Sequence, residues 1–336
     1  MNAIKFMFPL EAAVLSSKAI QQKLLLEYSI PILTCRLYYR SIHDTYIVRN
    51  SDCEFFFKVY RYGLRTKEDI LTEIDWISCL KNKGIAVTEP VVKKDGNYVV
   101  EFETLQGKRY GVLFTAAGVK SFNQVEETEA SNKKLGKYLA SVHEAWNSIP
   151  ISICKRRLDM PNVVDESMKY IREFSNIYYF DLEFLEDVAD KLKKKLELLS
   201  KNSPEYGVCH GDFYSGNIRF DNYDNPILFD FDFAGVGWRI YDIALFADAF
   251  GLGCSADDII KRVRRKTAFL EGYTSLQILS NEAISSIDLM IPFRRLFNIG
   301  TIYIAMSNTF GDEWAIRNTN DDINKLRKWL MLNPVL

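Results

Sequence analysis

Short apolar runs separated by turn-forming residues predict a small β-sheet in the first third of the chain. Residues 50–52 lie between two of these runs and indicate a hairpin. Thr66, followed three residues later by Asp69, resembles a capping box and predicts the start of a helix that Gly84 ends. The predicted strands are residues 32–39, 45–49, 53–61, 86–93, 98–104 and 109–115, and a capping helix within residues 1–27 precedes them.

From about residue 125 onward, apolar positions recur mainly at helical spacing. One short strand-rich island at residues 206–231 interrupts this pattern, and the chain has no internal repeat or low-complexity tract. We therefore predict an α+β fold with two domains. The first, residues 1–116, is β-rich with an N-terminal helix and one embedded helix, and the second, residues 117–336, is mainly helical.

Composition narrows the class of protein. The 336 residues are 48% hydrophobic, which is ample for a large buried core. Lys and Arg total 43 against 44 Asp and Glu, so the net charge is −1. Sequence-independent nucleic-acid binding needs clustered excess cations, so we expect no nucleic-acid partner. The net charge does not exclude a local basic groove.

Cysteine usage and hydropathy favour a cytoplasmic protein. Six cysteines stand singly with no C-x-x-C pair, which is typical of reduced thiols rather than a disulfide framework or a zinc site. The most apolar later segment, residues 289–306, carries Arg294 and Arg295 near its middle. A bilayer would penalise both charges, so we expect a buried helix and no membrane partner. The oligomeric state is left open.

The island carries the candidate chemistry. Asp212 follows an apolar strand, Asn217 comes five residues later, and Asp230 ends the next apolar run, so a hairpin would return it beside Asn217. Hard oxygen ligands of this kind suit Mg²⁺ shared with phosphate oxygens. Each residue taken alone is more often an ordinary turn former, but their order and spacing together favour a phosphate site.

The order of motifs in the island resembles the catalytic region of the aminoglycoside phosphotransferase and choline kinase superfamily, whose members are relatives of protein kinases. Protein kinases carry H-R-D-x-x-x-x-N followed by D-F-G. The resemblance implies a bilobal protein-kinase-like fold with a β-rich N-lobe and a mainly helical C-lobe. The matching residues are His210-Gly211-Asp212, Asn217, Asp230-Phe231-Asp232 and Tyr241-Asp242-Ile243-Ala244, with Gly211 at the position of the kinase arginine.

The resemblance also implies a role for each residue of the motif. Asp212 would accept or orient the proton of the acceptor hydroxyl, and Asn217 with Asp230 would hold Mg²⁺ against the nucleotide phosphates. His210 and Asp242 would support the loop, with Asp242 accepting backbone N–H bonds from it. In the same superfamily a helix carries Leu-x-x-x-His, which matches His143 here.

A kinase N-lobe also needs a strand lysine that contacts phosphates and a helix glutamate that holds this lysine. Lys58 lies in the middle of an apolar strand, and Glu73 lies in the following helix. The alternative for Lys58 is an edge-strand lysine that reaches water, and Glu68 and Asp69 are rival partners for it.

The hinge that contacts adenine is assigned by position to Leu113 and Thr115 at the two ends of a three-residue segment. The phosphate-covering loop is also inferred by position only, because residues 41–45 contain no glycine. A Walker A motif is excluded, since Gly107-Lys108 is followed by Arg109 and no glycine stands five residues earlier.

The predicted function is phosphoryl transfer from ATP, or alternatively GTP, with Mg²⁺, to a hydroxyl of a small metabolite or antibiotic. Mixed charges in residues 245–315 favour a neutral or anionic acceptor over a polycation. The main candidates for acceptor contacts are Tyr214, Trp238 and Arg294, with Asp248, Arg295, Tyr303 and Trp314 as further candidates.

Two other functions stay open. One is a Ser/Thr protein kinase of the bacterial stress type, which shares the loop. Only eleven residues separate Asp230 from Asp242, which leaves no recognisable activation segment and disfavours regulated protein phosphorylation. The other is a pseudokinase that binds nucleotide as a scaffold, which the full set of polar motif residues disfavours.

Overall fold

The computed structural model describes residues 10, 12–152, 154–248 and 255–336. Its chain divides into two units. The N-terminal unit comprises Met1–Ile74 and Thr88–Ala116, and the C-terminal unit comprises Asp75–Val87 and Ala117–Leu336. Residues 75–87, the second half of helix α2 and the segment after it, therefore group with the helical unit. The α+β class predicted from the sequence is confirmed.

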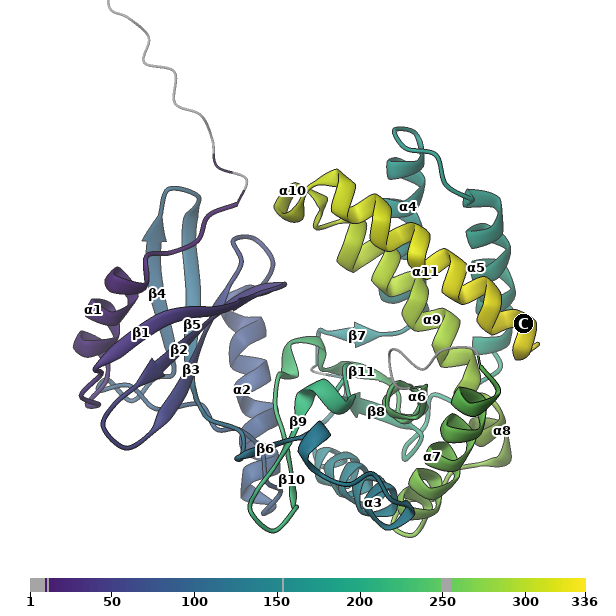
Figure 1. Ribbon diagram of the computed structural model, residues 1–336, viewed down its shortest axis with the longest axis horizontal. Helices are drawn as coiled ribbons and strands as arrows, with labels where there is room; N and C mark the ends of the chain where they lie inside the picture. Colours follow the sequence, from purple (N-terminus) through teal and green to yellow (C-terminus); the bar gives the residue numbers. More distant parts are fainter. Residues whose placement is uncertain (1–9, 11, 153, 249–254) are drawn as a thin grey trace, which may run out of the picture. The chain divides into compact units, whose positions relative to one another are not determined.

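The N-terminal unit is built on a five-stranded antiparallel sheet with the order β1-β2-β3-β5-β4 (Figure 1). Helix α1 packs on this sheet and buries Ile20 and Leu24 against Tyr46, Val48 and Phe57. In β2 the buried Tyr46 and Val48 alternate with less buried residues, so one face of this strand contributes to the core. The elements are α1 (Ser17–Glu27), β1 (Thr34–Arg40), β2 (His43–Arg49), β3 (Glu54–Tyr60), α2 (Lys67–Asn82), β4 (Val99–Thr104) and β5 (Gly107–Thr115).

The predicted capping box of α2 is present. The Thr66 hydroxyl accepts the Asp69 N–H, and the Asp69 carboxylate accepts the Thr66 N–H in return. Reciprocal bonds of this kind satisfy two of the free N–H groups at a helix start. Gly84, which was predicted to end the helix, has a positive φ of 74° just beyond it.

The strand predicted at residues 86–93 is wrong. This segment forms only isolated bridges, at Val87 and Pro90, and β4 pairs with β5 instead. Pro90 has no N–H and cannot donate to a ladder, which explains why the apolar run does not continue as a strand.

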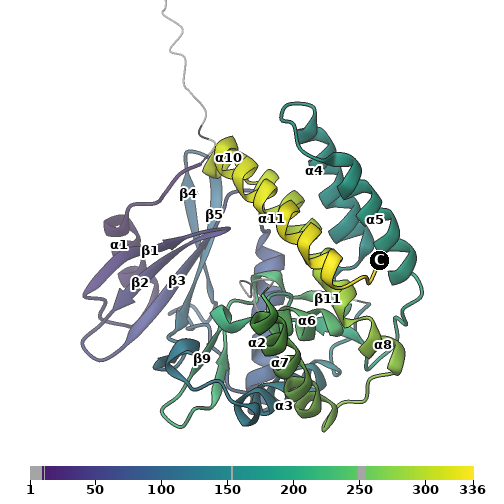
Figure 2. The same ribbon diagram turned by 45° about the vertical axis from the view of Figure 1, so that its right-hand side comes forward.

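The C-terminal unit is mainly helical, with two three-stranded sheets of the orders β10-β9-β6 and β7-β11-β8. Figures 1 and 2 show α3 running beside α7 and α11 running beside α9. The helices are α3 (Glu129–Trp146), α4 (Glu166–Ser175), α5 (Leu182–Leu196), α6 (Ile240–Asp248), α7 (Ala256–Thr274), α8 (Asn281–Ser285), α9 (Met290–Phe297), α10 (Ser307–Phe310) and α11 (Asp312–Leu332). The strands are β6 (Lys120–Ser121), β7 (Arg157–Leu158), β8 (Tyr206–Cys209), β9 (Ile218–Phe220), β10 (Pro226–Leu228) and β11 (Gly235–Trp238).

The apolar segment at residues 289–306 folds as α9 followed by a π-helical turn over Asn298–Ile304. Arg294 is buried within it, as expected of a helix inside the protein. Throughout the described ranges, the helices lack the combination of length and apolarity that a bilayer crossing requires.

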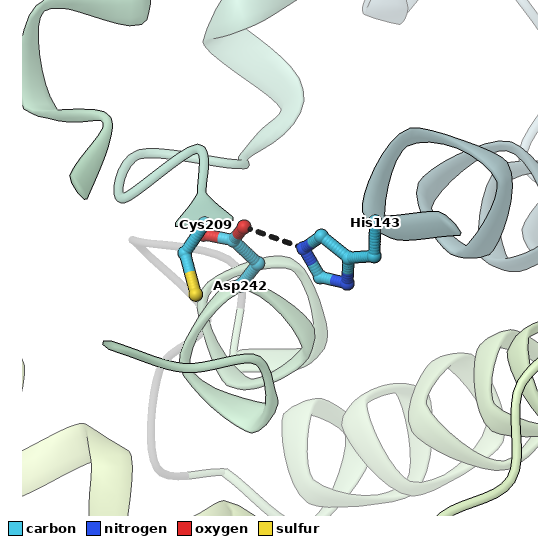
Figure 3. A group of neighbouring side chains, drawn as sticks. All are labelled: His143, Cys209 and Asp242. Carbon is cyan, nitrogen blue, oxygen red and sulfur yellow. Dashed lines mark hydrogen bonds and ion pairs between the residues drawn. The ribbon is translucent and has the colours of Figure 1, made fainter. Parts of the chain in front are cut away.

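A buried polar network joins α3, α6 and α7, and Figure 3 shows its His143 and Asp242. The Asp242 carboxylate lies 3.0 Å from Nε2 of His143, and Nδ1 of His143 lies 2.9 Å from the Tyr273 hydroxyl. An ionised carboxylate can only accept, so His143 donates from Nε2 and accepts the Tyr273 O–H at Nδ1. The ring is thus held as one neutral tautomer with both nitrogens bonded.

Cys209 lies beside this pair, and its Sγ, the imidazole and the carboxylate are near enough to one another to hold a metal ion (Figure 3). Burial raises the pKa of the Cys209 thiol well above its usual value, so the thiolate that a metal requires is disfavoured. The hydrogen bonds of His143 and Asp242 account for these side chains without an ion.

The network predicts acid-sensitive stability. Burial lowers the pKa of His143 from 6.5 to about 4, against the opposing effect of Asp242. The native state therefore binds this proton less tightly than the unfolded state does. The stability contribution is complete above pH 6.5 and is lost as the pH falls toward 4. At 1.36 kcal/mol per pKa unit, the fall from 6.5 to about 4 corresponds to about 3 kcal/mol.

His143→Gln should remove this pH dependence, because the amide keeps a donor for Asp242 but does not titrate. Urea unfolding between pH 7 and pH 4 should show the wild type losing about 3 kcal/mol more than the variant. Parallel pH curves for the two proteins would show that His143 is not buried in its neutral form.

Candidate active site

The loop after β8 is held by the carboxylate of Asp242. Its two oxygens accept the backbone N–H groups of His210 at 2.6 Å and Gly211 at 2.8 Å. The bonds expected of Asp242 are therefore present. Because the same carboxylate accepts from His143, one buried group connects the loop to α3 and α6.

The His210 side chain bridges two segments of the site. Nε2 lies 3.1 Å from the Phe229 carbonyl oxygen, and Nδ1 accepts the Asp212 N–H at 3.3 Å. Both nitrogens thus have backbone partners, which suits an orienting role better than proton transfer. The ring also packs edge-on against Phe231 at 4.8 Å between centroids.

Gly211 is required by geometry at the position where protein kinases carry arginine. Its φ of 76° lies in the left-handed region, and a Cβ there would stand 2.1 Å from the Phe233 carbonyl oxygen. Any side chain would push apart the loop and the segment that follows Asp230. The backbone approach therefore explains the H-G-D form of the motif.

Asp212 and Asn217 are brought together within the loop. Asn217 donates from Nδ2 to the Asp212 carbonyl oxygen at 3.0 Å and to Oδ2 of its carboxylate at 2.7 Å. Both hydrogens of the amide are used in this way, so Oδ1 is the Asn217 atom suited to hold a cation.

Asp212 is 9% exposed, and the pKa of its carboxyl group is raised. Burial is the main cause and Asp230 adds to it, whereas Arg294, His210 and the Asn217 hydrogen bond favour ionisation. A divalent cation would stabilise the anionic form of a carboxyl group whose pKa is raised by burial and by a neighbouring carboxylate.

Asp230 reaches Asn217 through the predicted hairpin. Ile218 of β9 pairs with Leu228 of β10, and the Phe229 N–H donates to the Asn217 carbonyl oxygen at 3.1 Å. Asp230 itself has a φ of 63° and a ψ of 70°, a left-handed conformation that non-glycine residues seldom adopt. Such a conformation turns the chain sharply after β10, and it is often retained at functional sites.

The second group of predicted residues lies in the N-terminal unit. Lys58 in the middle of β3 lies 3.2 Å from the Glu73 carboxylate of α2, and both side chains are buried. The Tyr60 hydroxyl donates to the other Glu73 oxygen at 3.0 Å. Glu73 is thus the partner of Lys58, while the rival Asp69 caps the helix and Glu68 is exposed.

The hinge residues have other backbone partners. The Leu113 carbonyl accepts the Val91 N–H at 2.7 Å, and the Thr115 N–H donates to the Glu89 carbonyl at 2.9 Å. Segment 88–91 therefore occupies two backbone groups that the hinge assignment reserved for adenine. The sequence pattern did not reveal this because the apolar run at residues 86–93 predicted a regular strand.

The three main acceptor candidates lie in different surroundings. Trp238 is buried, donates its Nε1 hydrogen to the Ser200 carbonyl and packs edge-on against Tyr206, so it belongs to the core. Tyr214 is half-buried within the loop, and its ring lies over Gly216. Arg294 binds Oδ1 of Asp212 at 2.6 Å, an ion pair that the sequence did not reveal because 82 residues separate the partners.

Two arginines of the region 245–315, Arg262 and Arg295, are paired with carboxylates inside the protein. Arg295 lies 2.9 Å from Asp322, and Arg262 lies 3.7 Å from Asp248. Because these two cations have carboxylate partners of their own, they do not argue for an anionic acceptor.

Comparison with known proteins agrees with this geometry. A family model described as "Phosphotransferase enzyme family" matches residues 40–279. A functionally uncharacterised protein of Synechocystis sp. is 29% identical, covering 81% of this chain and 74% of its own length.

Solved kinases share the fold. An amicoumacin kinase in complex with AMP-PNP and Ca²⁺ has a TM-score of 0.73 at 20% identity, covering 91% of this chain and 94% of its own. A microcompartment-associated aminopropanol kinase has a TM-score of 0.72 at 21% identity, covering 93% and 98%. The protein-kinase-like fold predicted from the motifs is confirmed, and the chain belongs to the phosphotransferase enzyme family.

Proposed function

We propose that this phosphotransferase moves the γ-phosphoryl group of ATP, with Mg²⁺, onto a hydroxyl of a small molecule. The observation that carries the proposal is the loop in which Asp212 and Asn217 are hydrogen-bonded side by side and Asp230 is returned next to them. A kinase that shares the fold was solved with an ATP analogue and a divalent cation, which favours ATP over GTP as the donor.

Asp212 is assigned to the acceptor hydroxyl. Its carboxylate is fixed by Asn217 on one oxygen and by Arg294 on the other. A carboxylate held in this way can align the hydroxyl for attack and accept its proton late in the transfer. Alignment is the larger contribution, because phosphoryl transfer is catalysed mainly by positioning and charge stabilisation.

Asn217 and Asp230 are assigned to Mg²⁺. They offer an amide oxygen and a carboxylate, which are the hard ligands that Mg²⁺ prefers. When bound, Mg²⁺ neutralises phosphate charge and fixes the geometry of the phosphates. Near Asp212 and Asp230 it would also relieve the repulsion between the two carboxylates.

Lys58 is assigned to the α- and β-phosphates, with Glu73 holding its ammonium group in place. The acceptor is assigned to a small hydroxylated compound, such as an amino alcohol or an antibiotic. The kinases that share the fold support this class, since they are named for amicoumacin and aminopropanol.

Asp212→Asn should lower turnover by about 10²–10⁴-fold while leaving nucleotide binding intact. The amide keeps the shape of the side chain but cannot accept the hydroxyl proton. The measurement is a coupled ADP-release assay on a panel of amino alcohols, sugars and antibiotics. Asp221→Asn, a change in the exposed turn between β9 and β10, is the control and should retain activity. Full activity of Asp212→Asn would reject the assigned role.

Asp230→Asn should abolish the extra thermal stabilisation that Mg²⁺ adds to ATP binding, because a ligand stabilises only the state that binds it. Asp224→Asn is a closely matched control, since Asp224 is also an aspartate in the left-handed region, with a φ of 59°. An Mg²⁺-dependent rise in Tm that survives in Asp230→Asn would exclude this residue as a metal ligand.

Lys58→Met should destabilise the fold by about 3–5 kcal/mol, because it leaves the Glu73 carboxylate buried without its cation. The double variant Lys58→Met/Glu73→Gln should regain much of this stability yet keep a raised KM for ATP. Lys67→Met, which breaks an exposed pair with Glu101, should cost less than about 1 kcal/mol. Recovery of a normal KM in the double variant would show that Lys58 has only a structural role.

A further inference from the structure

Arg294 connects α9 to the loop that carries Asp212. Its Nη2 donates to Oδ1 of Asp212 at 2.6 Å, and its Nη1 donates to the Gly211 carbonyl oxygen at 3.1 Å and to the Tyr241 hydroxyl at 3.2 Å. Two of these three acceptors belong to the H-G-D motif itself. The arginine thus binds the side chain of the assigned catalytic residue and the backbone just before it.

The guanidinium is itself fixed by packing. Its central carbon lies 5.5 Å from the centroid of the Phe233 ring and 5.4 Å from that of Phe297, and the residue is 8% exposed. Stacking on aromatic faces restricts a planar cation to one orientation. Phe233 follows the Asp230 turn, Phe297 lies on the same helix as Arg294, and the two ring centroids lie 5.3 Å apart with the rings edge to face. The two rings therefore form one aromatic corner that the guanidinium packs against.

Arg294 and Asn217 together fix the plane of the Asp212 carboxylate. Arg294 donates to Oδ1 and Asn217 donates to Oδ2, at 2.6 and 2.7 Å. An ionised carboxylate offers about four lone-pair positions on its two oxygens, so two donors leave room for a hydroxyl in defined directions. A carboxylate fixed at both oxygens cannot rotate about its terminal bond.

We propose that Arg294 is a positioning residue for the phosphotransferase reaction, which holds the Asp212 carboxylate in the orientation that receives the acceptor hydroxyl. This role replaces the direct acceptor contact expected from the sequence, and it rests on the proposed function. Misplacing a reacting group by about 1 Å can cost about 10²-fold in rate, so a residue that acts only through Asp212 has a large effect on turnover.

Lysine cannot replace Arg294 in this arrangement. Its ammonium group is a single point donor on a flexible stem and cannot span Asp212, Gly211 and Tyr241 in the fixed geometry of a guanidinium. Arg294→Lys should therefore lower kcat by about 10²-fold while the KM for ATP stays close to that of the wild type. Arg294→Ala should be further impaired, and added guanidinium ion should partly restore its kcat.

Arg265→Lys is the matched control. Arg265 also makes a two-pronged bond to a carboxylate, with Glu127 at 2.5 and 2.6 Å, and its guanidinium carbon lies 5.8 Å from the ring centroid of Phe246. Its partner lies outside the loop, so kcat should stay unchanged even if Tm falls. A purely structural role for Arg294 would make the two lysine variants alike, with lower Tm and normal kcat per folded molecule.

The decisive experiment measures kcat, KM for ATP and Tm for the wild type and these three variants with one active acceptor. A fall in kcat confined to the Arg294 variants, with rescue of Arg294→Ala by guanidinium, is expected. An active wild type with normal kcat in Arg294→Lys and no rescue of Arg294→Ala would overturn the positioning role alone. A wild type that transfers phosphate to no acceptor would overturn the proposed function and this role with it.

Discussion

The buried carboxylate of Asp242 determines the geometry of the loop that carries Asp212. It accepts the two successive N–H groups of His210 and Gly211, and it is itself held by His143. A carboxylate without exposure to water is costly unless its oxygens are fully bonded, and here backbone and imidazole donors meet that need. The loop therefore has one conformation, because any other would leave this charge unsatisfied.

The same loop holds a second buried carboxylate, that of Asp212, whose surroundings have opposing effects on its ionisation. Asp212 is disfavoured as an anion by burial and by Asp230, and it is supported by Arg294, His210 and Asn217. Two neighbouring aspartates, of which one disfavours the ionisation of the other, do not stabilise a core. The arrangement suits a site for a divalent cation and polyphosphate, because the cation would stabilise both carboxylates and the loop supplies oxygen ligands for it.

Features encoded locally could be predicted from the sequence. The strand expected at residues 53–61 is observed as Glu54–Tyr60, the capping box of α2 is present, and the hairpin that returns Asp230 toward Asn217 pairs β9 with β10. These features depend on neighbours within a few residues or on motifs with fixed spacing. The Lys58–Glu73 pair could also be predicted, because a lysine inside an apolar strand needs a partner.

Features that depend on distant contacts could not be predicted. The ion pair of Arg294 with Asp212 joins residues far apart in the chain, and no local pattern distinguishes Arg294 from its neighbour Arg295. Trp238 was expected near the acceptor, but Tyr206 and Ser200 hold it in the core. Strand β11 was also hidden, since its glycines match no apolar pattern. The need for glycine at position 237 follows from the approach of Leu158, whose carbonyl oxygen would lie 2.6 Å from an added Cβ.

The central claim is that Asn217 and Asp230 hold one divalent cation beside Asp212. The most direct test is a crystal structure of the protein with AMP-PNP and Mn²⁺, in which anomalous scattering locates the metal. The account predicts an anomalous peak at roughly 2.2 Å from Oδ1 of Asn217 and from a carboxylate oxygen of Asp230. A nucleotide-bound crystal whose metal peak lies away from both side chains would contradict it.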